Sequence, residues 1–329
     1  MNAIRSFKLS RVASVALWSA ILVPTAVGIG LSACSSTSGG AGFGPTGDDA
    51  GAGVDGSHVV TDAAPQSTTV SDAGGAPGSD AGTNDGGSGA LGCAVLPLCD
   101  DFEGIAAGGP PKASLWTVLS PQTATAGSVT IDNTQSHSGK NSVKVVAGSN
   151  YNDHAFITNS DAVTKIGKHI FGRYFMRIAS AFGTSHSTIM SMADMTPGSH
   201  LRLSEQNSAF DWNREMGDFT LPSIDPVGMA ASYSPAVNEW FCVEFEIDAT
   251  QQPHAFINTW INSKLIAGLV SDNTPTPDID QSWNGTTNNS TWEPSLVDFS
   301  LGWESYGNEG NTLWFDDVAL GAARIGCGN

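Results

Sequence analysis

Three polar side chains at alternate positions of one short segment have the types needed to hold a carboxylate and to transfer a proton. His200, Arg202 and Gln206 would share one face of an extended strand, because successive side chains of a strand point to opposite sides. Arginine offers a planar fork that matches a carboxylate, and histidine is the side chain that titrates near neutral pH. Tyr306, much further along the chain, has a phenol that can supply a proton.

Other segments repeat this pattern of one apolar and one mixed face. In segment 200–206, Leu201 and Leu203 point away from the polar face, and only Glu205 breaks the alternation. In segment 297–306, apolar residues alternate with a face that ends in Glu304 and Tyr306. A face that mixes aromatic and ionisable groups is what a sugar-binding groove requires, since rings stack on sugars and polar groups bind hydroxyls. An ordinary solvated sheet face is the alternative explanation.

Short alternating runs, rather than helical periodicity, dominate residues 92–329. Clusters of Gly, Pro, Asn and Asp separate these runs. The expected strands are 142–147, 170–178, 186–192, 200–206, 240–247, 255–262, 297–303 and 311–320. Eight or more strands in one region predict an all-β fold, a two-sheet antiparallel β-sandwich of the jelly-roll type.

The acidic composition excludes bulk electrostatic binding of nucleic acid. The chain has 329 residues, with 32 Asp and Glu against 14 Lys and Arg, and a formal net charge of −18. Proteins that bind nucleic acid in this way carry a positive field. The sequence lacks a GxSxG nucleophile elbow, an HExxH zinc motif and a P-loop. Glu244 and Glu246, two positions apart on one strand face, leave a glycosidase-like carboxylate pair as an alternative.

The N-terminus has the layout of an exported, lipid-anchored protein. Residues 1–33 begin with basic groups, continue as an apolar run and end in Leu-Ser-Ala before Cys34, which is similar to a bacterial lipobox. An uncleaved transmembrane helix is the alternative interpretation of this run. Ser35, rather than Asp, follows the cysteine and favours the outer membrane. We expect a cell-envelope lipoprotein that contacts the membrane through its lipid anchor only.

Residues 34–91 are expected to form a tether between the lipidated cysteine and the folded domain, 92–329. This segment is rich in Gly, Ala, Ser, Thr and Asp and has almost no large apolar side chain. Such a composition buries too little surface to offset its ordering entropy. The tether would hold a monomeric domain off the membrane; a functional acidic segment is the alternative.

Four further cysteines, Cys93, Cys99, Cys242 and Cys327, follow the lipobox. An even number in an exported protein suggests two disulfides. Four cysteines allow three pairings. The short separation of Cys93 and Cys99 favours a bond between these two, with Cys242 and Cys327 as the second pair.

Several short motifs in a fixed order along the chain resemble one family. They occupy residues 99–104, 137–142, 200–202, 212–215, 302–306, 312–317 and 323–328. They resemble the core domain of the fungal cellulose-induced protein (Cip-one) family, over essentially residues 98–328. That family is a concanavalin-like β-jelly roll related to glucuronan and alginate lyases. The resemblance therefore implies this fold and a polysaccharide partner, from plant cell walls or another uronic-acid source.

The resemblance also implies a structural calcium ion. The ligands that it implies are Glu103, Ser138, Asn141 and Asp316. Oxygen ligands of this kind suit calcium, although a plain glycine turn and a strand-edge charge would explain the same residues. The family pairs cysteines that correspond to Cys242 and Cys327. Its other disulfide is missing here, because Asn152 and Asp153 stand where the family has a cysteine.

Resemblance to those lyases implies β-elimination on a uronic-acid polymer. In this reaction one group neutralises the substrate carboxylate, a base removes the proton on C5 and an acid protonates the departing O4. The expected catalytic residues are His200, Arg202, Gln206 and Tyr306, with Tyr306 as the acid, or as the base if its pKa is depressed. The expected substrate-binding residues are His154, His186, Trp212, Asn213, Arg214, Asp218 and Glu304. Among these, His186 and His154 are further candidates for the base.

Each catalytic residue also has an ordinary interpretation. Arg202 could pair with Glu215 or Glu304 across the sheet, His200 could be a polar strand residue, and Tyr306 could be a hydrogen-bonded residue at the core edge. For the whole protein, the alternative functions are a non-catalytic carbohydrate-binding module and a structural surface protein with the same fold.

Overall fold

The computed structural model describes residues 93–119, 127–195, 199–251, 254–272, 280, 283 and 292–328. The expected leader 1–33, the expected lipidation site Cys34 and the expected tether therefore lie outside the described residues. Over the part of the chain that is described, no helix is both long and apolar enough to cross a membrane.

Two β-sheets make up almost all of the described chain. The strands of the larger sheet are β1 (Leu98–Asp100), β3 (Gly127–Asp132), β4 (Ser142–Ala147), β6 (His169–Ile178), β11 (Phe241–Asp248), β12 (Phe256–Ile261), β13 (Lys264–Leu265) and β15 (Thr312–Gly321). Those of the smaller sheet are β2 (Thr117–Leu119), β5 (His154–Asn159), β7 (Ser187–Ala193), β8 (His200–Gln206), β9 (Ala209–Arg214), β10 (Phe219–Leu221) and β14 (Phe299–Ser305). The helices are short: η1 (Cys93–Val95), α1 (Ala162–Ile166), α2 (Pro226–Ala230) and η2 (Ala267–Leu269).

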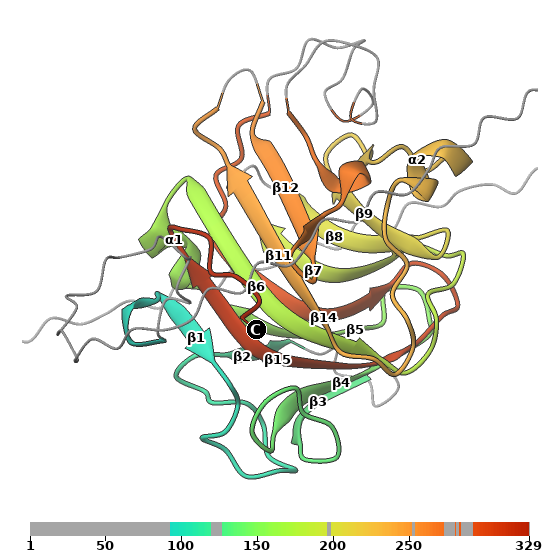
Figure 1. Ribbon diagram of the computed structural model, residues 1–329. Helices are drawn as coiled ribbons and strands as arrows, with labels where there is room; N and C mark the ends of the chain where they lie inside the picture. The colour runs from blue at the N-terminus through green and yellow to red at the C-terminus, as the bar shows by residue number, and fades with distance from the viewer. Residues whose placement is uncertain are drawn as a thin grey trace, which may run out of the picture. The chain divides into compact units, whose positions relative to one another are not determined.

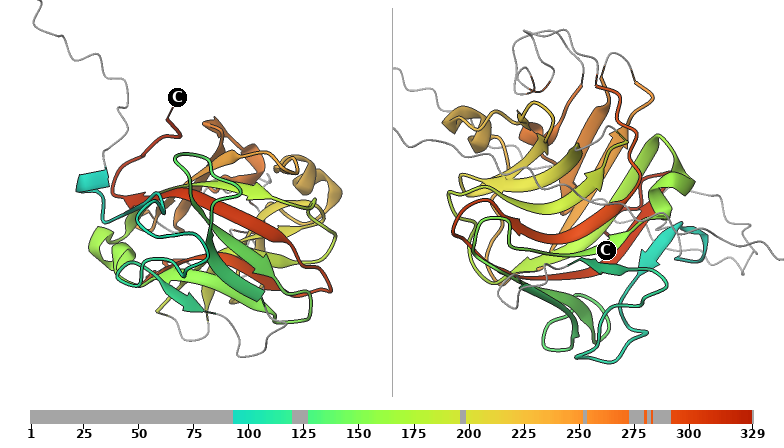
Figure 2. Two further views of the ribbon diagram at one scale, coloured as in Figure 1. Left: turned by 90° about the horizontal axis from the view of Figure 1, so that it is seen from below. Right: turned by 180° about the vertical axis from the view of Figure 1, so that it is seen from behind.

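The two sheets lie in two layers, as Figure 1 and the view from behind in Figure 2 show. The larger sheet has the order β13-β12-β11-β6-β15-β4-β3, with β1 also paired to β15, and the smaller sheet has the order β10-β9-β8-β7-β14-β5-β2. All of the described strand pairs are antiparallel. Neighbours such as β6 and β15 are far apart in sequence, which is typical of a jelly roll. The expected all-β, two-sheet jelly roll is confirmed.

All eight strands expected from the sequence are present, with ends that differ by at most two residues. The strands that the sequence did not predict are mostly short, as β2, β10 and β13 are. β9 was missed for another reason, since all six of its residues are buried and no alternation marks its two faces.

The core lies between the sheets and is built from the apolar face of each strand. On β11, Phe241, Val243, Phe245 and Ile247 point inward and are almost wholly buried. On β8, Leu201 and Leu203 do the same, which leaves His200, Arg202 and Gln206 on the opposite face. Each large apolar side chain buried in this way contributes about 1.5–3 kcal/mol. The core therefore fixes which side chains the smaller sheet presents outward.

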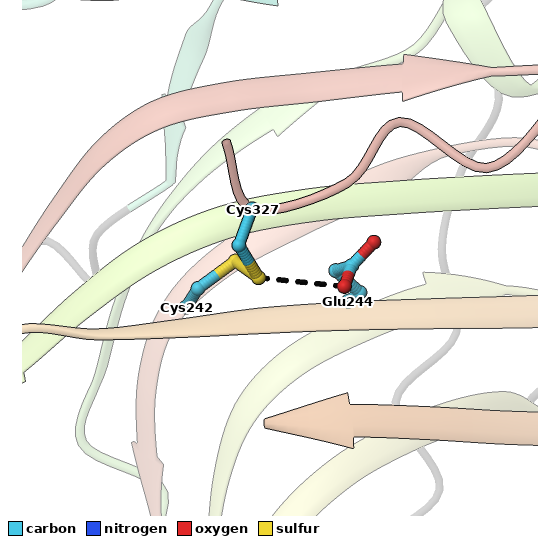
Figure 3. Close-up of side chains that lie close together, drawn as sticks. All are labelled: Cys242, Glu244 and Cys327. Carbon is cyan, nitrogen blue, oxygen red and sulfur yellow. Dashed lines mark hydrogen bonds between the residues drawn. A yellow bond between two sulfur atoms is a disulfide. The ribbon is translucent and has the colours of Figure 1, made fainter. Parts of the chain in front are cut away.

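Both expected disulfides are present, between Cys93 and Cys99 and between Cys242 and Cys327. The second joins β11 to the C-terminal segment, and Figure 3 shows Glu244 beside it. Oε2 of Glu244 lies 3.3 Å from Sγ of Cys327 and accepts a hydrogen bond from Nη2 of Arg324 at 2.8 Å. The buried carboxylate and the disulfide therefore hold the C-terminal segment on the larger sheet.

Candidate functional site

The outward face of the smaller sheet carries a cavity of about 370 Å³, which we call the first cavity. Its lining residues come from β2, β5, β7, β8 and β14 and from the segments beside them: Leu119, His154, Phe156, Ser191, His200, Arg202, Glu215, Asp298, Ser300 and Glu304. They alternate along the strands with residues of the core. The first cavity therefore brings together two expected catalytic residues, His200 and Arg202, and two expected binding residues, His154 and Glu304.

A single carboxylate links the two catalytic candidates in the first cavity. Oε2 of Glu215 lies 2.6 Å from Nδ1 of His200, and Oε1 accepts a hydrogen bond from Nη2 of Arg202 at 2.7 Å. Arg202 does pair with Glu215, as one of the interpretations of the sequence held. An imidazole that donates from Nδ1 to a carboxylate has its lone pair on Nε2. Glu215, which the sequence analysis gave no role in the site, thus orients both neighbours.

Tyr306 follows β14 and stands next to this cluster. Its hydroxyl donates to Oε2 of Glu304 at 2.8 Å, and its ring centroid is 5.3 Å from the guanidinium carbon of Arg202. The same ring also stacks on His186, with centroids 5.1 Å apart. Burial and then the charge of Glu304 raise the pKa of Tyr306, and Arg202 offsets this only in part. Tyr306 therefore lacks the depressed pKa that a role as the base would need.

A second cavity of about 360 Å³ lies beyond His186, which is one of its lining residues. The others are Gln206, Asp218, Thr220, Ser223, Ile224 and Asp225. Nδ2 of Asn213 donates to Oδ1 of Asp218 at 2.9 Å, so these two expected binding residues are adjacent. Burial and then the charge of Arg202 lower the pKa of His186. Gln206 thus lies in a different cavity from His200, although both are on β8.

We call the two cavities, together with the ring pair His186–Tyr306 that contacts residues of both, the groove. Arg202 and Glu304 line the first cavity and contact Tyr306. His186 lines the second cavity and stacks on the same ring. The two cavities are therefore linked through Tyr306.

Trp212 lies outside the groove, contrary to expectation. It is opposite Leu203 in the β8–β9 pairing, and residues opposite each other point to the same side of a sheet. The indole is 0% exposed and donates from Nε1 to Oγ1 of Thr259 at 2.8 Å. Its ring packs edge-to-face on Phe245 of the other sheet. Trp212 is thus a core residue.

Arg214 also faces away from the groove, because it is opposite the inward-facing Leu201. Its guanidinium lies among the rings of Phe219, Trp283 and Trp292, at 4.4, 5.0 and 5.3 Å from their centroids. Nη2 donates to the carbonyl oxygen of Trp283 at 2.9 Å, and burial lowers the pKa of Arg214 to about 10. This arginine is a packing element at the far end of β9 and not a substrate ligand.

Two acids on β8 and β9 are buried, and the sequence analysis gave neither a role. Asp211 is wholly buried, and burial followed by the charge of Asp218 raises its pKa to about 7. Glu205 is opposite Phe210, and burial followed by the charge of Glu309 raises its pKa to about 9. The break that Glu205 makes in the alternation of segment 200–206 was the signal in the sequence for a buried acid.

The glycosidase-like pair lies on the wrong sheet. Glu244 and Glu246 are both on β11 of the larger sheet, whereas the groove is on the smaller one. Glu244 is occupied by Arg324 at the C-terminal segment, and Glu246 contacts His169 at 2.7 Å and Asn258 at 2.9 Å. Neither carboxylate can act on a ligand in the groove.

The four residues of the expected calcium site come together at the turn before β4. Oε1 of Glu103 accepts hydrogen bonds from the backbone nitrogens of Lys140 and Asn141, at 2.6 and 2.7 Å. Oδ2 of Asp316 accepts from the backbone nitrogens of His137 and Ser138, at 2.8 and 3.1 Å. The carboxylates of Glu103 and Asp316, which are far apart in sequence, thus both bind the backbone of the turn 137–141.

The donor set at this turn fits a hard cation. Asp316 is fully buried, and burial followed by the charge of its neighbour Asp317 raises its pKa to about 7. Nδ2 of Asn141 donates to the carbonyl oxygen of Ile105, so its amide oxygen points elsewhere. Carboxylate, amide, hydroxyl and carbonyl oxygens are the ligands that calcium takes.

Comparisons with known proteins agree with this architecture. Residues 102–323 match the family model described as "Polysacc_lyase-like: Cip1-like, core domain". The solved structure of "Cellulose induced protein, Cip1" is 31% identical, with a TM-score of 0.62, over 70% of this chain and 100% of that chain. The endo-β-1,4-glucuronan lyase from the fungus Trichoderma reesei is 13% identical, with a TM-score of 0.47, over 66% of this chain and 95% of that chain. No curated protein sequence matches. This chain belongs to the Cip1-like family, and residues 102–323 form its core domain.

Proposed function

We propose that this protein is a polysaccharide lyase that cleaves a uronic-acid polymer by β-elimination in the groove. The observation that carries the proposal is the carboxylate of Glu215, which holds His200 and Arg202 side by side in the first cavity. The description of the family as polysaccharide-lyase-like supports a polysaccharide as the partner.

In the proposed reaction, Arg202 binds the carboxylate of the sugar in the first cavity. This contact draws electron density from the adjacent carbon and acidifies the proton on C5. Nε2 of His200 removes that proton, and Glu215 stabilises the imidazolium that results. The electron pair left on C5 forms the C4–C5 double bond as the bond between C4 and O4 breaks.

Tyr306 supplies the proton that the departing O4 takes up. Its raised pKa keeps the phenol protonated at neutral pH, and the hydrogen bond to Glu304 fixes its direction. The phenol is then restored by proton return from the imidazolium through solvent. His154 would contact the sugar at one end of the groove, and His186, Gln206 and Asp218 the sugars at the other end. Asn213 is buried and would orient Asp218.

A panel of polymers tests the proposal. The full-length protein, purified in detergent, is incubated with glucuronan, alginate and an uncharged glucan, and the ultraviolet absorbance of an unsaturated uronate is followed. The proposal expects an increase with a uronate polymer and none with the glucan. Binding to a polymer without any increase would instead favour a carbohydrate-binding module, and neither binding nor increase would favour a structural surface protein.

We also propose that Glu103, Ser138, Asn141 and Asp316 hold a structural calcium ion. The ion would tie the turn before β4 to β15, and its role would be stability rather than chemistry. The groove is on the other sheet, so the site can be altered without touching the proposed catalytic residues.

Chelation should lower the melting temperature of the wild-type protein, and Asp316→Ala should abolish the difference between chelated and calcium-loaded samples. A ligand bound only by the folded state stabilises it by about 2.7 kcal/mol when present at a hundredfold excess over its Kd. Glu246→Ala removes an acid from the same sheet but not from this cluster, and it should keep the full response. Identical melting of metal-free and calcium-loaded wild type would exclude the site.

We further propose that Cys34 is the lipidated first residue of the mature protein and anchors it in the outer membrane. Cys34→Ala should move the protein from the membrane fraction to the soluble fraction, because only the thiol can accept the lipid. The matched control, Ser35→Ala, leaves the thiol in place and should remain with membranes. Equal partitioning of Cys34→Ala and wild type would refute the lipid anchor.

A further inference from the structure

Tyr151 is the only aromatic among the exposed large apolar side chains of the described residues, at 67% exposure. It lies in the turn that joins β4 to β5, at the edge of the groove. An exposed aromatic ring beside a sugar-sized cavity is a common feature of carbohydrate sites.

The turn that carries Tyr151 is held firmly against β14. The backbone nitrogen of Asn152 donates to the carbonyl oxygen of Ser305 at 2.8 Å, and the nitrogen of Ser305 donates to the carbonyl oxygen of Asp153 at 3.0 Å. Oδ2 of Asp153 also accepts from the backbone and side-chain nitrogens of Asn150, both at 2.9 Å. These bonds fix the backbone on both sides of Tyr151 before any ligand arrives.

The ring of Tyr151 packs on Tyr306, the residue that links the two cavities. It contacts Tyr306 edge-to-face, with centroids 5.9 Å apart and planes at 76°. Tyr306 in turn contacts Arg202 of the first cavity and His186 of the second. We therefore expect a polymer that occupies both cavities to run past Tyr306 and close to Tyr151.

We infer that Tyr151 is a stacking subsite for a pyranose ring of the polymer, at the edge of the groove. This inference rests on the proposed function, since it needs a polysaccharide in the groove. The exposed ring face would pack on the apolar face of a sugar, and the fixed turn keeps the ordering cost of this contact low. Tyr151 touches none of the reacting atoms, so it positions the polymer and takes no part in proton transfer.

Kinetics and binding with three variants test the inference. Tyr151→Ala should raise KM and Kd for a glucuronan-type polymer about tenfold, the loss of one stacking contact, and leave kcat within about twofold of wild type. Tyr151→Phe keeps the ring and should behave as wild type. Leu265→Ala, which removes a 47% exposed apolar side chain from β13 of the other sheet, is the matched control and should change neither value. All variants should melt with the wild type, because the side chains are exposed.

The outcomes distinguish a failure of the Tyr151 subsite from a failure of the proposed lyase activity. A wild type that cleaves the polymer, with an equally tight Tyr151→Ala variant, would overturn the subsite and leave the lyase intact. A wild type that binds without cleavage would remove the lyase, and a tenfold weaker Kd for Tyr151→Ala would still support the subsite. A wild type that neither binds nor cleaves any polymer of the panel would overturn both. A Tyr151→Phe variant as weak as Tyr151→Ala would show that stacking is not the cause.

Discussion

Arg202→Lys should lower kcat on a uronate polymer by at least about a hundredfold, although the positive charge is kept. Nη2 of Arg202 is bonded to Glu215, so the arginine must hold Glu215 and the substrate carboxylate with different parts of one fork. A lysine has a single ammonium group on a flexible stem and cannot serve both. The measurement is kcat and KM for each variant on the same polymer.

The neighbours of Arg202 should show the same pattern of loss. His200→Ala should reduce kcat by about 10²–10⁴-fold, because the base acts in the transition state, with a smaller effect on affinity. Glu215→Gln keeps the shape but removes the charge that stabilises the imidazolium, and Tyr306→Phe removes the proton donor. Both should reduce kcat more than they raise KM.

The control for this series is Arg177→Lys on the larger sheet. Arg177 lies over the ring of Trp314 and donates to Asn238, away from the groove, so its kinetics should match the wild type. Wild-type rates in Arg202→Lys, His200→Ala and Tyr306→Phe would show that the chemistry occurs elsewhere, even if the polymer is cleaved.

Trp212→Ala should lower the free energy of unfolding by about 3–5 kcal/mol. Its indole is completely buried between the sheets, packs on Phe245 and donates to Thr259, so truncation leaves a cavity and an unpaired hydroxyl. Where the variant is folded, its Kd for the polymer should equal that of the wild type. Denaturant unfolding and binding measured on the same samples check both parts.

Trp240→Ala is the comparison for this effect. Trp240 precedes β11, is only half-buried and stands edge-on to His137, so its removal should cost less stability. A Trp212→Ala variant as stable as the wild type but with weakened binding would contradict the placement of Trp212 in the core.

The strands and the groove face could be predicted from the sequence because alternation reports burial on one side only. Leu201 and Leu203 face the core, and this alone places His200 and Arg202 outward and together. The cysteines could be paired for a similar reason, since the separation along the chain decides which loops can close. The structure confirms both the strand faces and the two disulfides.

Trp212 and Arg214 were misplaced because their strand shows no alternation between buried and exposed residues. Every residue of β9 is buried, so nothing in that segment shows that Trp212 and Arg214 face inward whereas Asn213 faces the groove. Pairing to β8 decides this, and register is not visible in one sequence. The role of Glu215 depends likewise on the turn after β9. Gln206 lines a different cavity from His200, and the residue that links the two cavities, Tyr306, comes from far along the chain.

The masses of the products from a glucuronan-type polymer separate elimination from every other outcome. The full-length protein and the Arg202→Lys variant are each incubated with the polymer, and the fragments are weighed by mass spectrometry. Elimination in the groove predicts fragments with an unsaturated end and no added water, formed by the wild type and scarcely by the variant. Fragments that each carry an added water, or a wild type that binds the polymer and leaves it intact, would contradict the lyase.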